Sequence, residues 1–329
     1  MVGRRVTLQD VASTAGVSLK TASRVVNGER YVAETTAERV RAAVRQLGFR
    51  PHQAARSLAR GRRLPMAGLL VTTLENPHVV ALAHGVERVL RAAGHSLIIA
   101  STDEDAQQER QLLEDFQDRG VDSLVIVPSG EDHRHLFAAA GSMSMVLAHR
   151  IIAGLDADSV APDDWGATRA AVKGLLREGH ERIAFIGDLD YIYNIRQRIA
   201  GFRQAHREFG AATQEDLLRF GVRTTEESRS VVSGMLDSPN PPTAIFGSNN
   251  LLTLGVLEEL HERGREVAVV GFDDLPEARY FDVPVKVLAY DKSGVGRTAA
   301  QLLLERAAAE DPAPRHVTMP VTARRFTGR

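Results

Sequence analysis

Residues 64–329 contain two series of short apolar runs separated by amphipathic stretches. The first series predicts strands over 66–71, 96–100 and 123–127 and helices over 79–93 and 107–119. The second predicts strands over 182–187, 244–247 and 267–272 and helices over 195–209, 226–237 and 251–262. Because continuous apolar runs are typical of parallel strands covered on both faces, we expect two doubly wound, parallel-sheet α/β subdomains. A ligand is then expected in the crevice at the carboxyl ends of the strands.

Residues 1–50 have the pattern of three short helices instead. The first has an apolar face of Leu8, Val11, Ala12 and Ala15, and Thr7 and Asp10 have the spacing of a capping box. Gly16 permits a sharp turn, and Ser18 is placed to cap a second helix whose inward residues are Ala22, Val25 and Val26. A third helix is expected from about Thr36 to Leu47, with Gly48 as its C-terminal stop. The pattern predicts an all-α helix-turn-helix domain.

The outward face of the second helix is polar. It consists of Leu19, Lys20, Thr21, Ser23, Arg24 and Asn27. In a helix-turn-helix protein this helix lies in the major groove, where such side chains meet base edges and phosphates. The pattern alone is also explained by a three-helix bundle with a solvated face.

The charge of the chain is divided unevenly. The net charge is −1, yet residues 1–63 hold 13 Lys and Arg against 4 Asp and Glu, a net charge of +9, and the remainder has a net charge of −10. A basic segment binds polyphosphate by releasing counterions, whereas an acidic body lacks that attraction. The division therefore indicates nucleic-acid binding by the first 63 residues, although a basic segment is also compatible with a simple solvated surface.

Composition argues against several classes of protein. The absence of cysteine excludes disulfides, thiolate metal sites and cysteine nucleophiles, and it fits a reducing cytoplasm. No apolar stretch approaches a membrane span, and the first 25 residues lack the apolar core of a signal peptide, so we expect a cytoplasmic protein. Dinucleotide, P-loop and zincin motifs are absent, and His133 and His135 lack a partner cluster, so we expect no cofactor, no metal site and no enzyme activity.

Residues 1–50 resemble the DNA-binding domain of the LacI/GalR family. The resemblance rests on the run T-L-Q-D-V-A-S-T-A-G-V-S-L-K-T-A-S-R-V-V-N-G from Thr7 and on E-R-V-R-A-A-V-R-Q-L-G-F-R-P, which ends at Pro51. It implies base contacts from Leu19, Lys20 and Arg24, of which Lys20 could donate to guanine and Leu19 could pack on a thymine methyl group. The phosphate or positioning contacts that it implies are Thr7, Ser18, Thr21, Ser23, Asn27, Tyr31 and Thr36.

Residues 51–63 are expected to form a hinge. Pro51 breaks the third helix, and H-Q-A-A-R-S-L-A-R-G-R-R then has the pattern of a helix of about eight residues, too short to persist alone in water. In the LacI/GalR family this segment becomes helical on DNA and inserts a leucine into the minor groove. The resemblance assigns that leucine to Leu58 and its small neighbours to Ala55 and Ala59, with Arg60, Arg62 and Arg63 on phosphates. The charges alone would equally suit a flexible linker.

Residues 64–329 resemble the periplasmic-binding-protein-like sensor of the same family. The segments that carry the resemblance are E-N-P-H-V-V-A-L-A-H-G-V-E, R-G-V-D-S-L-V-I-V-P-S, R-I-A-G-F, S-N-N-L-L-T-L-G and V-V-G-F-D-D-L-P. By matched position Arg198, Asn249 and Asp273 are expected to bind effector hydroxyls, and Asp163 and His149 are further expected contacts. For Arg198, Asn249 and Asp273 the alternative is a salt bridge or a turn cap, and Asp163 is open to a structural role.

The identity of the effector stays open. A sugar or polyol is the family default, but relatives also bind nucleobases and phosphorylated sugars. His149 stands where an acidic residue or asparagine is common, and Asn250 stands where an aspartate is common. Aromatic residues near the predicted cleft loops could stack on a ring or simply pack in the core; they are Trp165, Tyr191, Tyr193 and Phe272.

We therefore divide the chain into a helix-turn-helix domain (1–50), a hinge (51–63) and an effector-binding and dimerisation domain (64–329). The last contains two subdomains, and the chain is expected to cross from one to the other near residues 162 and 289. We expect a homodimeric transcription regulator that binds a pseudo-palindromic operator. Repression is the commoner behaviour in the family, so we expect a repressor. A solute-binding receptor and a sugar-modifying enzyme are the alternatives. The basic residues 1–63, which we call the head, argue against the solute-binding receptor. The lack of catalytic or cofactor groups argues against the enzyme.

Overall fold

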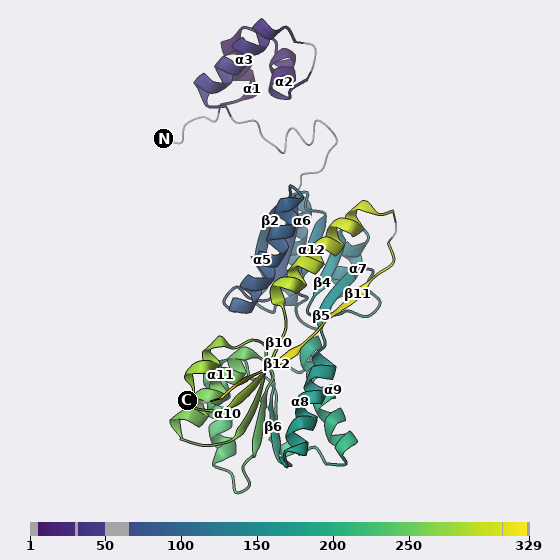
Figure 1. The fold of residues 1–329 in the computed structure, drawn as a ribbon. Coiled ribbons are helices and arrows are strands. Elements are labelled where there is room, and N and C mark those ends of the chain that lie inside the picture. Colours follow the sequence, from purple (N-terminus) through teal and green to yellow (C-terminus); the bar gives the residue numbers. More distant parts are fainter. Residues whose placement is uncertain (1–5, 30–31, 50–65, 311, 328–329) are drawn as a thin grey trace. The chain divides into compact units, whose positions relative to one another are not determined.

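The computed structural model describes residues 6–29, 32–49, 66–310 and 312–327 (Figure 1). The chain divides into two compact units, the first ending at Pro65 and the second beginning at Met66. The predicted hinge, with Ala55, Leu58 and Ala59, lies outside the described residues, as does Tyr31.

Three helices pack around one small apolar core in the first unit. They are α1 (Leu8–Ala15), α2 (Leu19–Val26) and α3 (Glu34–Leu47), and the core is built from Val11, Ala12, Ala15, Ala22, Val40 and Ala43. The capping box is confirmed, because Thr7 Oγ1 accepts from the Asp10 amide at 3.3 Å and the Asp10 carboxylate accepts from the Thr7 amide at 2.8 Å. Gly16 has a φ of 65°, the left-handed conformation that turns the chain from α1 towards α2. The helix-turn-helix is thus formed as predicted, with α3 beginning at Glu34 and not at Thr36.

The second unit contains two six-stranded sheets, the first in the order β11-β5-β4-β3-β1-β2 and parallel throughout. Its strands are β1 (Met66–Val71), β2 (Ser96–Ser101), β3 (Ser123–Ile126), β4 (Ser144–Ala148), β5 (Asp158–Pro162) and β11 (His316–Met319). One face packs against α5 (Pro77–Ala92) and α12 (Lys292–Ala308), and the other against α6 (Ala106–Asp118) and α7 (Arg134–Ala140). We call this half the first subdomain.

The second sheet has the order β12-β10-β9-β8-β6-β7, and only its edge strand β12 is antiparallel to its neighbour. Its strands are β6 (Ile183–Ile186), β7 (Leu218–Arg219), β8 (Ala244–Gly247), β9 (Ala268–Phe272), β10 (Val285–Ala289) and β12 (Thr322–Phe326). Helices α10 (Thr225–Leu236) and α11 (Asn250–Glu262) cover one face, and α8 (Asp164–Arg177) and α9 (Tyr193–Phe209) cover the other. Two short 3₁₀ helices, η1 (Glu215–Leu217) and η2 (Pro276–Tyr280), complete this second subdomain.

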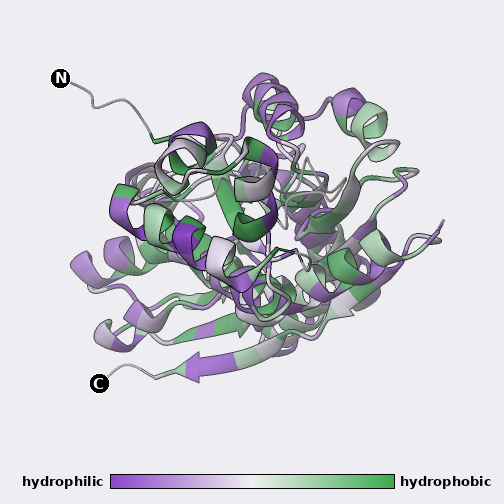
Figure 2. Ribbon diagram, turned by 90° about the horizontal axis from the view of Figure 1, so that it is seen from above, coloured by the Kyte–Doolittle hydropathy of each residue, from purple (hydrophilic) through white to green (hydrophobic). Residues whose placement is uncertain are grey.

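The predicted fold class is therefore confirmed, with an addition. The chain passes between the sheets three times: after β5, after β10, and from β11 to β12. The third passage, from Met319 to Thr322, was not anticipated from the sequence. The strand beside the C-terminus, β12, is largely hydrophilic and exposed, so no apolar run marks it (Figure 2).

Within the described residues, every helix is too short or too polar to cross a membrane.

Candidate DNA-binding surface and effector cleft

The three predicted base-contacting residues lie on the solvent side of α2. Leu19 has 47% of its surface exposed, and Lys20 and Arg24 are exposed as well. Arg24 makes one long ion pair, 3.7 Å from Nε to Glu29 Oε2. A leucine held in water costs hydrophobic free energy, which packing against a thymine methyl group would recover. The surface is therefore suited to reading base edges.

The remaining described DNA candidates lie near the ends of the helices of the first unit, and most of them make hydrogen bonds there. Ser18 Oγ accepts from the Thr21 amide at 3.1 Å and so caps α2, as Thr7 caps α1. At the other end of α2, Asn27 Nδ2 donates to Ser23 Oγ at 3.2 Å. Thr36 is half-buried in the first turn of α3. Helix N-termini such as those at Thr7 and Ser18 present free backbone N–H groups, which suit phosphate oxygens.

Several helices of the second unit begin close to the carboxyl ends of strands and have a side-chain N-cap. Among the N-caps are Asn76 for α5, Asp105 for α6, Asp163 for α8, Asn249 for α11 and Asp291 for α12, and each side chain accepts from a backbone N–H of the first turn. Asp163 is exposed and accepts from the Gly166 amide at 2.9 Å, so it caps α8, which is a structural role of the kind that the sequence left open. Asn249 caps through Oδ1, 2.9 Å from the Leu252 amide, and its Nδ2 lies 3.5 Å from Asp188 Oδ2.

Residues with strained backbone conformations follow the carboxyl ends of strands in both sheets. Among the described residues, the non-glycine residues with positive φ are Asp103, Glu104, His149 and Asp273. The first two follow β2, His149 follows β4 and Asp273 follows β9. Each such residue costs about 1–3 kcal/mol and is retained mainly where a side chain must be held in a particular place. The strain therefore points to the crevice between the sheets as the functional region.

Arg198 is buried, and protein groups surround its guanidinium. Nε donates to Asp164 Oδ1 at 2.8 Å, Nη1 donates to the Ser248 carbonyl, and Cζ lies 3.6 Å from the centre of the Phe272 ring. Nη1 is also 3.8 Å from Asp273 Oδ2. Arg198 thus forms the salt bridge that was the alternative to ligand binding. It connects α9 to the start of α8 and to the loop after β8.

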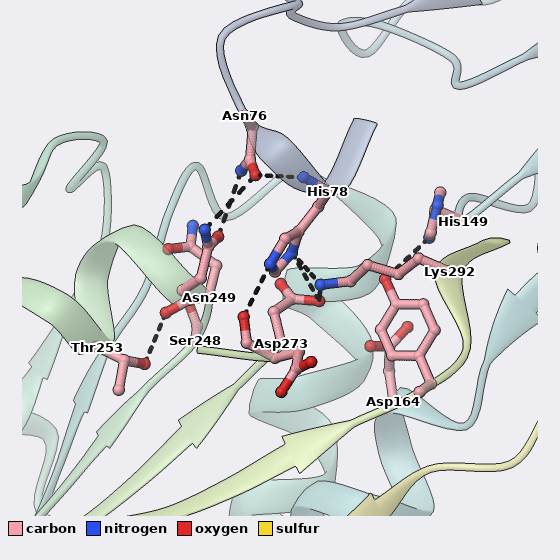
Figure 3. Close-up of polar contacts among 12 residues, drawn as sticks. Asn76, His78, His149, Asp164, Ser248, Asn249, Thr253, Asp273 and Lys292 are labelled. Atoms are coloured by element: carbon pink, nitrogen blue, oxygen red, sulfur yellow. Dashed lines mark hydrogen bonds and ion pairs between the residues drawn. The ribbon is translucent and has the colours of Figure 1, made fainter. Parts of the chain in front are cut away.

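Asp273 lies at the centre of a charged cluster that both subdomains supply (Figure 3). Its Oδ1 is 3.3 Å from Lys292 Nζ and 3.8 Å from His78 Nδ1. Burial opposes ionisation of Asp273, but the charges of Lys292 and Arg198 outweigh that cost and hold its pKa below the usual value. The cluster therefore presents an ionised acceptor between the subdomains.

His78 connects this cluster to the loop after β9. Its Nε2 is 2.8 Å from the Asp274 carbonyl oxygen, which only accepts, so Nε2 carries the hydrogen. Nδ1 is then free to accept from Lys292 Nζ. Burial lowers the pKa of His78, in keeping with a neutral ring, and burial also lowers the pKa of Lys292. Neither residue was predicted from the sequence, although each stands in the first turn of a helix next to a predicted cleft.

His149 has a neutral ring in the same region. Burial lowers its pKa to about 3, against the attraction of Asp273. Its Nδ1 is 3.1 Å from the Tyr290 hydroxyl, within hydrogen-bond distance, and the two rings meet edge to face. Because Tyr290 lies where the chain passes from β10 to α12, this contact links β4 to a passage between the subdomains.

Two cavities lie between the subdomains. The larger, about 610 Å³, is lined by both, including His78, Asn250, Asp274, Tyr290 and Lys292. The smaller, about 300 Å³, is lined by Pro128 and Arg150 of the first subdomain and by Tyr191, Tyr193 and Arg196 of the second. Both volumes fall in the range of small-molecule pockets. Phe272, by contrast, is buried under Arg198, and Trp165 is beside Arg169.

Within the described part of the chain, His, Asp and Glu side chains nowhere gather in a group of three or more that could hold a metal ion.

Comparison with known proteins identifies the family. Residues 7–52 match the model described as bacterial regulatory proteins, lacI family. Residues 65–328 match the model for periplasmic binding proteins and the sugar binding domain of the LacI family. The chain belongs to the LacI family. It is a DNA-binding transcriptional regulator with an effector-binding domain, and not an enzyme.

LacI-family relatives match along nearly the whole chain. The HTH-type transcriptional regulator PtxS of Pseudomonas plecoglossicida is 33% identical over 308 residues, which cover 92% of this chain and 89% of the relative. The HTH-type transcriptional repressor PurR of Haemophilus influenzae is 31% identical over 314 residues, or 93% of this chain and 92% of the relative. The solved complex of the transcriptional regulator CelR with cellobiose has 27% identity and a TM-score of 0.72, and covers 98% of this chain and all of that one.

The lac repressor dimer bound to operator and the anti-inducer ONPF shares the fold. Its TM-score is 0.82 at 23% identity, with 98% of this chain and 99% of that one covered.

Proposed function

We propose that this LacI-family protein is a homodimeric repressor of a pseudo-palindromic operator, and that a sugar-like effector bound between its subdomains controls it. The observation that carries the effector half is the cluster of Asp273, Lys292, Arg198 and His78, which joins strand ends of both subdomains at a cavity. Because operator DNA is its partner, we place its action in the cytoplasm.

The DNA half of the proposal rests on α2 and the charge of the head. Exposed Leu19, Lys20 and Arg24 are available for base edges, and the net charge of +9 over residues 1–63 supplies phosphate attraction. Two heads on a two-fold symmetric site would read half-sites one or more helical turns apart. Such symmetry is why we propose a homodimer on a pseudo-palindrome. The lac repressor, a dimer on its operator, gives a precedent within the fold.

The effector half rests on the chemistry of the cleft. An ionised Asp273 offers two acceptor oxygens, Lys292 and the Asn249 amide offer donors, and neutral His149 offers an acceptor or a donor. Alternating donors and acceptors of this kind suit ligand hydroxyl groups, and Tyr191 and Tyr193 at the smaller cavity supply ring surfaces. The cellobiose in the CelR complex agrees with a sugar-like effector. In this proposal Arg198 orients Asp273 and does not need to reach the ligand.

A two-part experiment tests the proposal with the full chain. Selection from random duplex DNA should yield a site with two-fold symmetry, which binds with a steep salt dependence. A thermal-shift panel of glucose, cellobiose, other neutral sugars, nucleosides and sugar phosphates should give at least one sugar that raises the melting temperature. A selected site without symmetry would refute the dimer on a pseudo-palindrome, and a panel in which only nucleosides bind would refute the sugar-like effector.

A further inference from the structure

Asn76 and Asn250 form a reciprocal amide pair between the two subdomains. Asn76 Nδ2 donates to Asn250 Oδ1 at 3.3 Å, and Asn250 Nδ2 donates to Asn76 Oδ1 at 3.5 Å. Asn76 comes from the first subdomain, just before α5, and Asn250 is the first residue of α11 in the second. Each side chain donates to and accepts from the other, so the pair forms between protein groups alone, without a ligand.

The pair is coupled to both helices that it joins. Asn76 Oδ1 also accepts from the His78 amide at 3.0 Å and so caps α5. Asn250 is 7% exposed and follows Asn249, whose side chain caps α11. The Asn76 side chain therefore both caps α5 and contacts Asn250. Because of this, the orientation of α5 fixes where the Asn76 amide group meets α11. An aspartate at position 250 could not donate and would leave only one of the two bonds.

Among the described residues, the other polar contacts between the subdomains involve charged or titratable groups. Lys292 meets Asp273, His78 meets the Asp274 carbonyl, and Arg196 lies 3.6 Å from Glu131. A ligand that binds Asp273 or Lys292 competes with the first of these. The asparagine pair is neutral, so neither ligand charge nor salt weakens it.

We propose that the Asn76–Asn250 pair is a latch that sets the proportion of closed sensor before any effector binds. By this account the two asparagines are positioning residues. The effector gains affinity when the closed form is already populated, because its apparent dissociation constant is the intrinsic one divided by the competent fraction. The proposal goes beyond the proposed function and does not depend on which effector binds.

Spin labels measure the latch directly in the full, ligand-free chain. The chain has no cysteine, so Phe137→Cys in α7 and Phe209→Cys in α9, at side chains 47% and 46% exposed, give one label in each subdomain. Pulsed electron–electron resonance then reports the distribution of distances between the subdomains. In the otherwise unchanged chain we expect a dominant short-distance population.

Two variants remove the pair while keeping the helices. Asn76→Ser keeps a side chain that caps α5 but cannot span to Asn250, and Asn250→Ala places a strong helix former at the start of α11. Each should lower the ratio of closed to open forms by about tenfold, which corresponds to about 1.4 kcal/mol, and the double variant should lower it no further. Thr224→Ala is the matched control, because it removes the capping box of α10 within one subdomain.

The outcomes separate a latch from general loosening. An unchanged distance distribution in either asparagine variant overturns the proposal, as does an additive loss in the double variant. A shift of the same size in Thr224→Ala would also overturn it, since any lost cap would then open the sensor. A sensor that opens only in the asparagine variants supports the latch whether or not the sugar panel finds an effector.

Discussion

Single side chains in the cleft are held by contacts that are distant in sequence. Arg198 and Asp273 were expected to lie together, and their side chains approach to 3.8 Å. Lys292 and His78 are 214 residues apart in sequence and were not predicted. No local sequence pattern marks either residue as part of the cleft, because they meet only when α5 and α12 pack beside each other. Ligand binding by Arg198, Asn249, Asp273, Asp163 and His149 stays a prediction, and the capping bond of Asp163 makes it the weakest member.

The depressed pKa of His149 makes stability depend on pH. An unfolded histidine takes up a proton below about pH 6.5, whereas the folded ring resists protonation down to about pH 3. The free energy of unfolding should therefore fall as the pH is lowered from 6.5, by at most about 2 kcal/mol between pH 6.5 and 5 for this one proton. His149→Asn, which tolerates the positive φ and keeps an amide that can donate to or accept from Tyr290, should flatten this fall. Urea unfolding of both proteins at several pH values measures it, and equal pH slopes would contradict the assignment.

At the scale of helices and strands, a clear apolar run predicted a strand even at an edge, as for β2, whereas no strand was predicted for the central β5 and β10. The apolar runs located β1, β3, β6, β8 and β9 to within about one residue, because these strands are buried on both faces. In contrast, β11 and β12 are exposed edge strands, and the pairing that defines them comes from residues far away in the chain. Helix boundaries were predictable where the sequence contains a recognisable capping residue, as at Thr7, Ser18 and Gly48.

The packing of α5 on α12 makes a prediction at this scale. A Cβ at Gly296 would lie 2.2 Å from the Leu82 carbonyl oxygen, so Gly296→Ala must push the helices apart. We expect a loss of about 1–3 kcal/mol in the free energy of unfolding. The matched control is Gly234→Ala in α10, where a Cβ meets no atom within 4 Å and alanine should be neutral or stabilising. Equal stability of the two variants in chemical denaturation would refute the close-packed arrangement.

At the scale of the whole molecule, affinity for DNA is assigned to the head and its control to the cleft. Lys20→Ala and Arg24→Ala should each weaken binding to the selected operator by about 1–3 kcal/mol and reduce discrimination against altered half-sites. Neither should change the melting shift that a bound sugar causes, because both residues belong to the first compact unit. Fluorescence anisotropy with matched and altered duplexes checks the first expectation. Full discrimination retained in both variants would show that another surface reads the DNA.

Operator binding by the full chain with and without the sugar that raises its melting temperature tests the central claim most directly. We expect saturating sugar to change the operator dissociation constant by about 5- to 150-fold, the usual size of allosteric coupling. Asp273→Asn, which removes the charge that Lys292 and Arg198 face, should bind the operator as tightly but respond to the sugar far less. An operator affinity that is the same with and without sugar, or a full response in Asp273→Asn, would contradict the account.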